Sequence, residues 1–316
     1  MKLMERKRYR ISGHESFPCR YAWLPKVVRL LQHDPSFFTY DDKVMVELGL
    51  GKNMVRSARF WAQATGIITV SRNHIALTPF GDTVLGRKKL DPYLEDIRTL
   101  WLLHWQLATD PDAPLLAWDY LLNRWQEPEM IPSIVTQKLL AEASRYDEGI
   151  SSVTIQQHLG VFLHTYVPTR GKKGKIQEDN LDCPLVELEL LRKTGDRESP
   201  KAKGGRESVY AFRYEDKPDI TPELFSYCIA DYWTKRFPNE HTLAFRDIAH
   251  GPGSPGRVFK LPEDAVRARL EGIDSTSLGC FTYNESAQLQ QLRKTGTSIV
   301  LQTFLENVYS REASHV

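Results

Sequence analysis

The sequence predicts a mainly α-helical protein with small β-hairpins, and three observations lead to this fold class. Most apolar runs repeat at the 3.6-residue period of an amphipathic helix. The strand-like runs are short and occur in pairs separated by turn residues. The composition, 41% hydrophobic and 26% charged among 316 residues, is that of globular domains with well-buried cores.

Charge and cysteine content narrow the class of protein. The formal net charge is only +2, so nucleic-acid binding has to come from local basic faces. The four cysteines form no C-x-x-C pair, which argues against a zinc ribbon and a secreted disulfide scaffold. The N-terminus lacks the apolar run of a signal peptide, and no stretch of about twenty apolar residues occurs. We expect a cytoplasmic protein without a membrane segment.

Residues 1–90 are predicted to form an N-terminal arm and a winged helix-turn-helix DNA-binding domain. Pro25 suits the first turn of a helix, and a glycine-containing turn from Gly49 to Gly51 separates two further helical runs. The runs "GIITV" and "HIAL" indicate a two-stranded hairpin, after which Thr78 and Pro79 begin another helix. Helices followed by a hairpin are typical of a winged helix.

Residues 91–150 are predicted to be a central helical bundle, because three amphipathic runs are separated by proline-bearing loops. Four tryptophans in this region have two readings, base stacking or packing between helices. Their spacing favours packing, since large aromatic side chains bury the most area. These residues are Trp101, Trp105, Trp118 and Trp125.

Residues 151–316 are predicted to form a C-terminal α+β, winged-helix-like domain with basic loops. The runs "PLVELELL" and "SVYAFRY" are interpreted as strands, and a glycine-rich basic loop joins them. That loop is either an extended wing or a solvated segment without regular structure. The following order of helix, turn, strand and helix loosely echoes the N-terminal domain.

The third helical run of the N-terminal domain is the strongest candidate DNA-binding element. Val55, Ala58 and Ala62 share its inner face. Its outer face carries donors and acceptors of the kind that read a major groove, although charged outer faces are common on helices. These residues are Lys52, Asn53, Arg56, Arg59 and Gln63.

Two further basic segments are predicted to contact DNA. Arg72 stands at the hairpin tip beside Asn73 and His74. This tip either contacts a phosphate or is a turn without a binding role. The glycine- and lysine-rich loop near residue 173 needs only to approach the duplex to raise affinity through counterion release. Its lysines are Lys172, Lys173 and Lys175.

The arm "SGHESFPCRYAWLPK" holds polar residues that its packing does not require. One reading is a phosphate site, with the guanidinium of Arg20 as a bidentate donor. The other is an internal salt-bridge network that fixes the arm to the fold. The residues concerned are His14, Glu15, Arg20 and Lys26.

Catalytic and metal-binding patterns are scarce. His241, Asp247 and His250 lie close together, but no H-x-x-x-H pair accompanies them, and a structural role is favoured. No Walker loop, G-x-S-x-G elbow or dinucleotide fingerprint occurs. We assign no metal ligand and no catalytic residue from the sequence.

The arm motif, the winged-helix pattern and the closing "SPGRVFKL" together resemble the bacterial domain-of-unknown-function family numbered four thousand and seven, over nearly the whole chain. The family is expected to have glycine where Ala22 stands, a mild departure. The resemblance implies a setting beside sulfur-transfer enzymes and ATPases that place phosphorothioate linkages in DNA for antiphage defence.

On this basis the expected function is that of a DNA-binding component of a phosphorothioate-modification system. The protein either only binds DNA or also nicks it to allow sulfur insertion. If the protein is an enzyme, we expect a nicking endonuclease that uses a divalent metal. The alternatives are a winged-helix transcriptional regulator of the same operon and a non-catalytic adaptor. A homodimer fits the regulator best.

Overall fold

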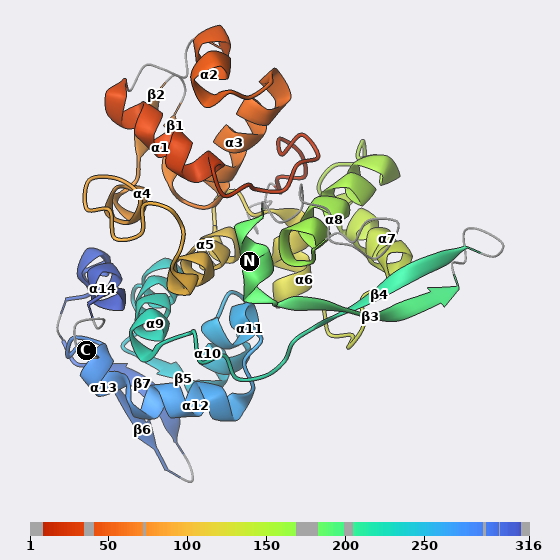
Figure 1. The fold of residues 1–316 in the computed structure, drawn as a ribbon. Helices are drawn as coiled ribbons and strands as arrows, with labels where there is room; N and C mark the ends of the chain where they lie inside the picture. The colour runs from red at the N-terminus through yellow and green to blue at the C-terminus, as the bar shows by residue number, and fades with distance from the viewer. Residues whose placement is uncertain are drawn as a thin grey trace.

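The computed structural model describes residues 9–34, 41–71, 74–168, 183–198, 205–286, 289–296 and 298–310. Its N-terminal module stands at the top of Figure 1 and consists of three helices followed by an antiparallel hairpin. The order of these elements is the predicted one. They are α1 (Trp23–His33), α2 (Asp41–Leu48), α3 (Lys52–Ala64), β1 (Ile68–Ser71) and β2 (His74–Leu77).

A short helix, α4 (Pro79–Val84), continues from the hairpin. The side chain of Thr78 accepts a hydrogen bond of 2.9 Å from the main-chain N–H of Gly81, so Thr78 is the predicted N-cap. Pro79 occupies the first helical position, where a missing N–H costs nothing.

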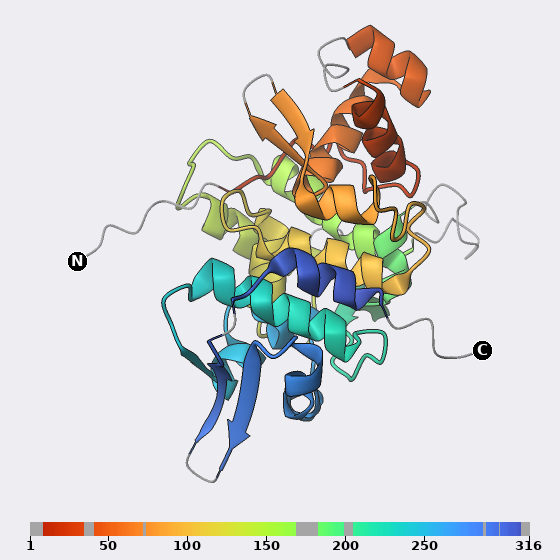
Figure 2. The same ribbon diagram turned by 90° about the vertical axis from the view of Figure 1, so that its left-hand side faces the viewer.

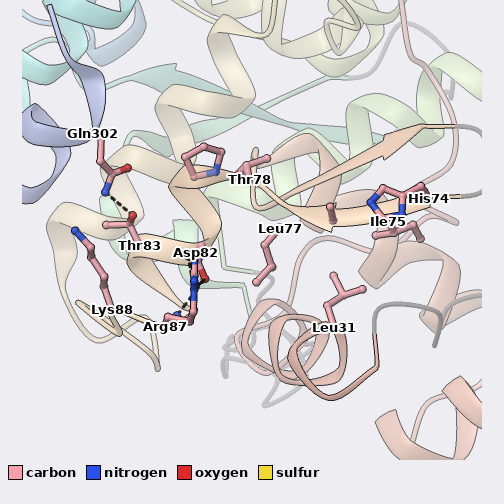
Figure 3. A pocket seen from close by; sticks show the side chains of 12 residues that line it. Leu31, His74, Ile75, Leu77, Thr78, Asp82, Thr83, Arg87, Lys88 and Gln302 are labelled. Carbon is pink, nitrogen blue, oxygen red and sulfur yellow. Dashed lines mark hydrogen bonds and ion pairs between the residues drawn. The ribbon is translucent and has the colours of Figure 1, made fainter.

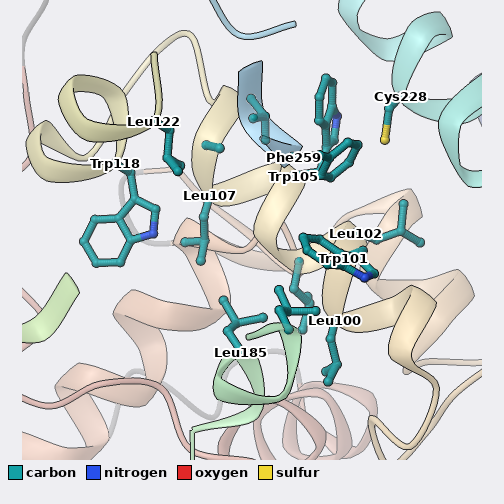
Figure 4. Close-up of a cluster of buried hydrophobic side chains, with 14 of the residues drawn as sticks. Leu100, Trp101, Leu102, Trp105, Leu107, Trp118, Leu122, Leu185, Cys228 and Phe259 are labelled. Carbon is teal, nitrogen blue, oxygen red and sulfur yellow. The ribbon is translucent and has the colours of Figure 1, made fainter. Parts of the chain in front are cut away.

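The central region is helical, as predicted. Its tryptophans are buried, with Trp105 and Trp118 fully inaccessible, so the packing interpretation is confirmed. Figure 4 shows Trp101, Trp105 and Phe259 facing one another within this core. The helices are α5 (Ile97–Thr109), α6 (Leu116–Asn123), α7 (Pro132–Ala143) and α8 (Ser152–Tyr166).

The predicted strand "PLVELELL" is wrong. Its first half is a 3₁₀ helix, η3 (Pro184–Leu188), and the strand β3 (Leu191–Glu198) begins only afterwards. Leu185 and Leu188 are both buried, as expected for residues three apart on a 3₁₀ helix, and η3 packs against α5 and α8. The burial of these two leucines against α5 and α8 therefore outweighs the strand propensity of the run.

Much of the segment interpreted as a basic loop is a β-ribbon. β3 pairs with β4 (Arg206–Phe212) from Leu191↔Phe212 to Glu198↔Arg206. The ribbon projects away from the helices in Figure 1. The sequence left two interpretations of this segment, an extended wing and a solvated segment without regular structure. The described strands favour the extended wing.

The C-terminal region combines helices with a three-stranded antiparallel sheet of order β5-β7-β6. The last helix, α14, packs against α9 and also against α4 of the N-terminal half (Figure 2). The elements are α9 (Pro222–Arg236), β5 (Thr242–Ala244), α10 (Phe245–His250), α11 (Pro255–Phe259), α12 (Glu263–Glu271), α13 (Ile273–Thr276), β6 (Phe281–Glu285), β7 (Gln290–Lys294) and α14 (Leu301–Val308).

The main hydrophobic core runs from Cys19 to Val308 and includes residues of all three predicted domains. The boundaries near residues 90 and 150 therefore stay a prediction. Within the part of the chain that the structure describes, every helix is too short or too polar to cross a lipid bilayer.

Candidate nucleic-acid interface

Helix α3 is positioned by the turn that precedes it. Gly49 adopts a φ of +63°, a left-handed conformation that glycine adopts without steric cost. The main-chain N–H of Leu50 then bonds to the carbonyl of Met45 at 3.1 Å, which closes the end of α2. The next helix starts two residues later and packs against both α1 and α2.

Helix α3 has a buried face and an exposed face, as its periodicity predicts. Val55, Ala58 and Ala62 are buried. The residues at 52, 56, 59 and 63 recur at helical spacing and form one stripe. Of the five predicted contact residues, three are exposed and two are partly exposed: Lys52, Asn53 and Arg56, then Arg59 and Gln63.

The charge of this stripe is not neutralised within the described structure. Helix α3 contains Lys52, Arg56 and Arg59 and no acidic residue. Among the described residues, none donates to, accepts from or pairs with these three side chains. A helix whose cations lack internal partners presents a positive field that favours a polyanion.

A third face of α3 holds the arm. The hydroxyl of Ser57 donates to the carbonyl of His14 at 2.9 Å, and the indole N–H of Trp61 donates to the carbonyl of Phe17 at 2.9 Å. The ring of Phe60 meets the imidazole of His14 edge to face. The arm is therefore fixed directly to the helix that carries the basic stripe.

His14 also links α3 to the central helices. The main-chain N–H of Ala117, in α6, donates to Nε2 of His158 at 3.1 Å. His158 therefore carries its proton on Nδ1, which lies 3.1 Å from Nε2 of His14. Burial, together with the neighbouring His14, lowers the pKa of His158 to about 3, and burial also lowers the pKa of His14. Both rings are neutral near pH 7.

The other three arm residues have separate surroundings. Lys26 donates to the carbonyl of Leu48 at 2.9 Å and so caps the end of α2. The guanidinium of Arg20 lies over the ring of Trp23, 5.6 Å from its centroid. Glu15 is exposed. The structure therefore does not bring the four predicted residues into one cluster, and phosphate binding by Arg20 stays a prediction.

The remaining predicted DNA contacts are only partly described. His74 is exposed at the start of β2, while Arg72 and Asn73 lie outside the described residues. The same is true of Lys172, Lys173 and Lys175. The β3–β4 ribbon carries further exposed cations, which the sequence analysis placed in a basic loop: Arg192, Lys193, Arg197 and Arg206.

The closing motif "SPGRVFKL" is structural. Ser254 caps α11, and a Cβ on Gly256 would lie 2.3 Å from the carbonyl oxygen of Ala249, so only glycine fits. The buried ammonium of Lys260 donates to the carbonyl of Leu122 at 2.6 Å, at the end of α6. Burial lowers the pKa of Lys260 to about 7.

Two hollows lie elsewhere on the molecule, and their cations are largely paired. A groove of about 730 Å³ lies between β2, α4 and α14 (Figure 3). There Arg87 pairs with Asp82 at 2.6 Å and Lys88 pairs with Glu306. A cleft of about 990 Å³ lies between α8 and the ribbon. The basic stripe of α3 differs from both in having no such partners among the described residues.

Among the described residues, no three His, Cys, Asp or Glu side chains gather in a way that suits a metal ion. His250, considered in the sequence with His241 and Asp247, pairs instead with Glu263 at 2.6 Å. This arrangement agrees with the structural role favoured for His250.

Comparison with known proteins identifies the family. A family model described as "Protein of unknown function (DUF4007)" matches residues 11–309. The chain belongs to the DUF4007 family. The resemblance seen in the arm and in "SPGRVFKL" is thereby confirmed.

Two solved structures are similar to the DUF4007 chain over nearly its full length. A magnesium ion-bound crystal structure of SspB has 26% sequence identity and a TM-score of 0.80, covering 96% of this chain and 91% of that chain. A second crystal structure of SspB has the same identity and TM-score, covering 98% and 92%. No curated protein matches this chain.

Sequence reasoning missed the residues that hold the arm in place. Ser57 and His158 form two of its main contacts, yet neither stands in a recognisable motif. His158 lies 144 residues from His14. The only local sign is a histidine within an otherwise apolar helical run, which more often indicates a satisfied core residue than a site.

Proposed function

We propose that this protein is a DNA-binding component of a bacterial DNA phosphorothioate-modification and antiphage defence system. In this proposal α3 is the recognition helix of a winged helix-turn-helix and enters the major groove. The hairpin β1–β2 is the wing, with Arg72 at its tip. Lys172, Lys173 and Lys175 add contacts to phosphates, and the partners are the sulfur-transfer and ATPase proteins of the system.

The observation that carries the proposal is the charge of α3. Three cations and no acid lie on this helix, and the cations have no ion-pair partner among the described residues. Arginine and lysine suit guanine and phosphates, while Asn53 and Gln63 suit adenine. The helix is followed directly by a two-stranded hairpin, the order of elements expected of a winged helix.

The similarity to SspB supports placing the protein in such a system. One of the two similar structures contains a magnesium ion, whereas the described residues of this chain form no cluster of three His, Cys, Asp or Glu side chains that suits a metal ion. With a divalent metal the protein would nick DNA and give the sulfur-inserting partner access to the backbone. Without it the protein acts as an adaptor that places its partners on DNA.

Binding is tested first. Arg56→Ala and Arg59→Ala should each weaken affinity for a duplex by about 1–3 kcal/mol at fixed salt, without a change in melting temperature. Arg246→Ala is the matched control, because Arg246 is an exposed arginine on α10, outside the proposed interface. Equal affinity of all three variants and the wild type would contradict the proposal.

Nicking is tested by relaxation of a supercoiled plasmid with Mg²⁺ or Mn²⁺, with and without the partner proteins. Relaxation that EDTA abolishes and that Arg56→Ala weakens supports the nickase. Binding without relaxation supports the adaptor. Selective binding to one promoter as a dimer on two half-sites would instead support the regulator.

A further inference from the structure

The arm contains a tight turn whose backbone is unusual. The main-chain N–H of Phe17 bonds to the carbonyl of His14 at 2.8 Å, which closes a four-residue turn. Its two central residues, Glu15 and Ser16, have φ values of +48° and +64°. Turns with two left-handed central residues are normally built from glycine, asparagine or aspartate, because side chains crowd the backbone there.

The fold holds this turn rigidly. Its two ends are bonded to Ser57 and Trp61 of α3, and the His14 ring is bonded to His158 of α8. Gly13, with a φ of +105°, precedes the turn, and a Cβ there would lie 2.8 Å from the ring of Phe60. The chain thus has glycine where the packing demands it and side chains at the two left-handed positions of the turn.

The side chains of Glu15 and Ser16 make no contact that stabilises the fold among the described residues. Glu15 and Ser16 are both exposed. Among the described residues, the carboxylate of Glu15 and the hydroxyl of Ser16 have no hydrogen-bond or ion-pair partner. The strained backbone anchors the arm through its main-chain bonds, but these bonds need neither side chain, and backbone strain beneath exposed side chains often marks a functional contact.

The turn lies beside the basic stripe of α3. Its anchors Ser57 and Trp61 lie on the helix face next to the one that carries Arg56, and Asn53 lies one helical turn before Ser57 on the same face. The turn is therefore held next to the proposed DNA-binding surface.

We propose that Glu15 is a base-contacting residue, whose carboxylate accepts a hydrogen bond from an exocyclic amino group in the groove that α3 enters, with cytosine as the preferred base. The inference rests on the proposed function. A carboxylate repels phosphates, so beside a DNA-binding helix its favourable partner is a donor on a base edge. Ser16, with both a donor and acceptors, supports it at the neighbouring position.

Three variants separate the chemistry from the backbone strain. Glu15→Gln keeps the shape and the strain and removes the charge. Glu15→Asn also relieves the strain, because asparagine tolerates the left-handed region. Glu148→Gln is the matched control, since Glu148 is exposed in the loop after α7. The probe is a pool of duplexes with a randomised central segment, from which bound molecules are recovered and sequenced.

The wild type should select a base pair at one position, and discrimination there should fall about tenfold in both Glu15 variants, because an amide oxygen accepts a weaker hydrogen bond than a carboxylate and the amide also donates one. Affinity for unselected DNA should be unchanged or higher, because a negative charge is lost. Glu15→Asn should melt at a higher temperature than the wild type, and Glu148→Gln should match the wild type in every measurement.

Unchanged base selection in both Glu15 variants would overturn the inference. If Arg56→Ala and Arg59→Ala still weaken binding in that case, the proposed function stands and only the role of Glu15 fails. If the arginine variants also bind normally, the proposed function fails and the role of Glu15 fails with it.

Discussion

The N-terminal and C-terminal modules share an order of elements but differ in surface chemistry. In each, helices lead into an antiparallel hairpin, β1–β2 in one and β6–β7 in the other. The helix α3 is free of acidic residues. By contrast, α12 contains Glu263, Asp264 and Glu271 beside two arginines.

The cations of α3 and α12 have different surroundings. Arg267 pairs with Asp264 and Glu285, and Arg269 pairs with Asp216 at 2.8 Å. Arg269 also donates to the carbonyls of Ile220 and Lys217. These arginines therefore hold the C-terminal module together, whereas those of α3 stay available. Similar arrangements of helices and strands thus leave the choice of partner to the outer side chains.

The comparison predicts that the buried faces of the two modules contribute equally to the free energy of unfolding. Trp61 and Phe281 are both fully buried. Trp61→Ala and Phe281→Ala should each lower the free energy of unfolding by about 3–5 kcal/mol, because each leaves a cavity in the core. Chemical denaturation measures this. A cost below about 1 kcal/mol for either variant would show that its module is not part of the common core.

A second prediction concerns acid. His158, with its pKa lowered to about 3, binds a proton more weakly in the folded than in the unfolded chain. Its contribution to stability is therefore full above pH ~6.5, is lost as the pH falls toward 3, and has dropped by about 2 kcal/mol at pH 5. Burial lowers the pKa of His104 to about 4, which adds a loss of the same sign.

The measurement is denaturation of His158→Gln at pH 7 and pH 5. The difference in stability between the two pH values should be about 2 kcal/mol smaller than in the wild type. His250→Gln is the control, since the His250 ring pairs with Glu263 near the surface of the other module. An unchanged difference in His158→Gln would mean that His158 is not buried as a neutral ring in the folded protein.

A third prediction concerns the salt dependence of DNA affinity, which should differ between variants on the exposed faces of α3 and α12. If α3 contacts phosphates, Lys52→Gln and Arg56→Gln should each reduce the slope of log affinity against log salt concentration by about one. Arg267→Gln should leave the slope unchanged, because Arg267 is occupied by Asp264 and Glu285. Titration of a fluorescent duplex at several salt concentrations gives the slopes. Equal slopes in all variants would remove the distinction between the modules.

The last prediction concerns Arg20→Ala. The contact of the Arg20 guanidinium with the Trp23 ring is worth about 0.5–2 kcal/mol. If Arg20 holds a phosphate, DNA-dependent activity should be lost while the melting temperature stays nearly unchanged, and Arg20→Lys should not restore it, because lysine lacks the two-pronged donor. A stability loss of 3–5 kcal/mol with normal DNA affinity would show that Arg20 has a structural role instead.

The sequence by itself determined the elements whose signals are local. The inner face of α3, the glycine turn before it, the Thr78 cap and the burial of the four tryptophans all follow from neighbours within about one helical turn. The outer residues of α3 follow from the same periodicity. Such features are readable because hydrogen bonds and side chains three or four residues apart determine them.

Only the tertiary structure decided what each long-range contact does. The His14 ring meets His158 across 144 residues, and Lys260 caps α6 across 138 residues. The run from Pro184 became a 3₁₀ helix because α5 and α8 bury its leucines. Pairing across the chain depends on which surfaces meet in space, and a run of residues carries no local sign of a partner that folding alone brings near.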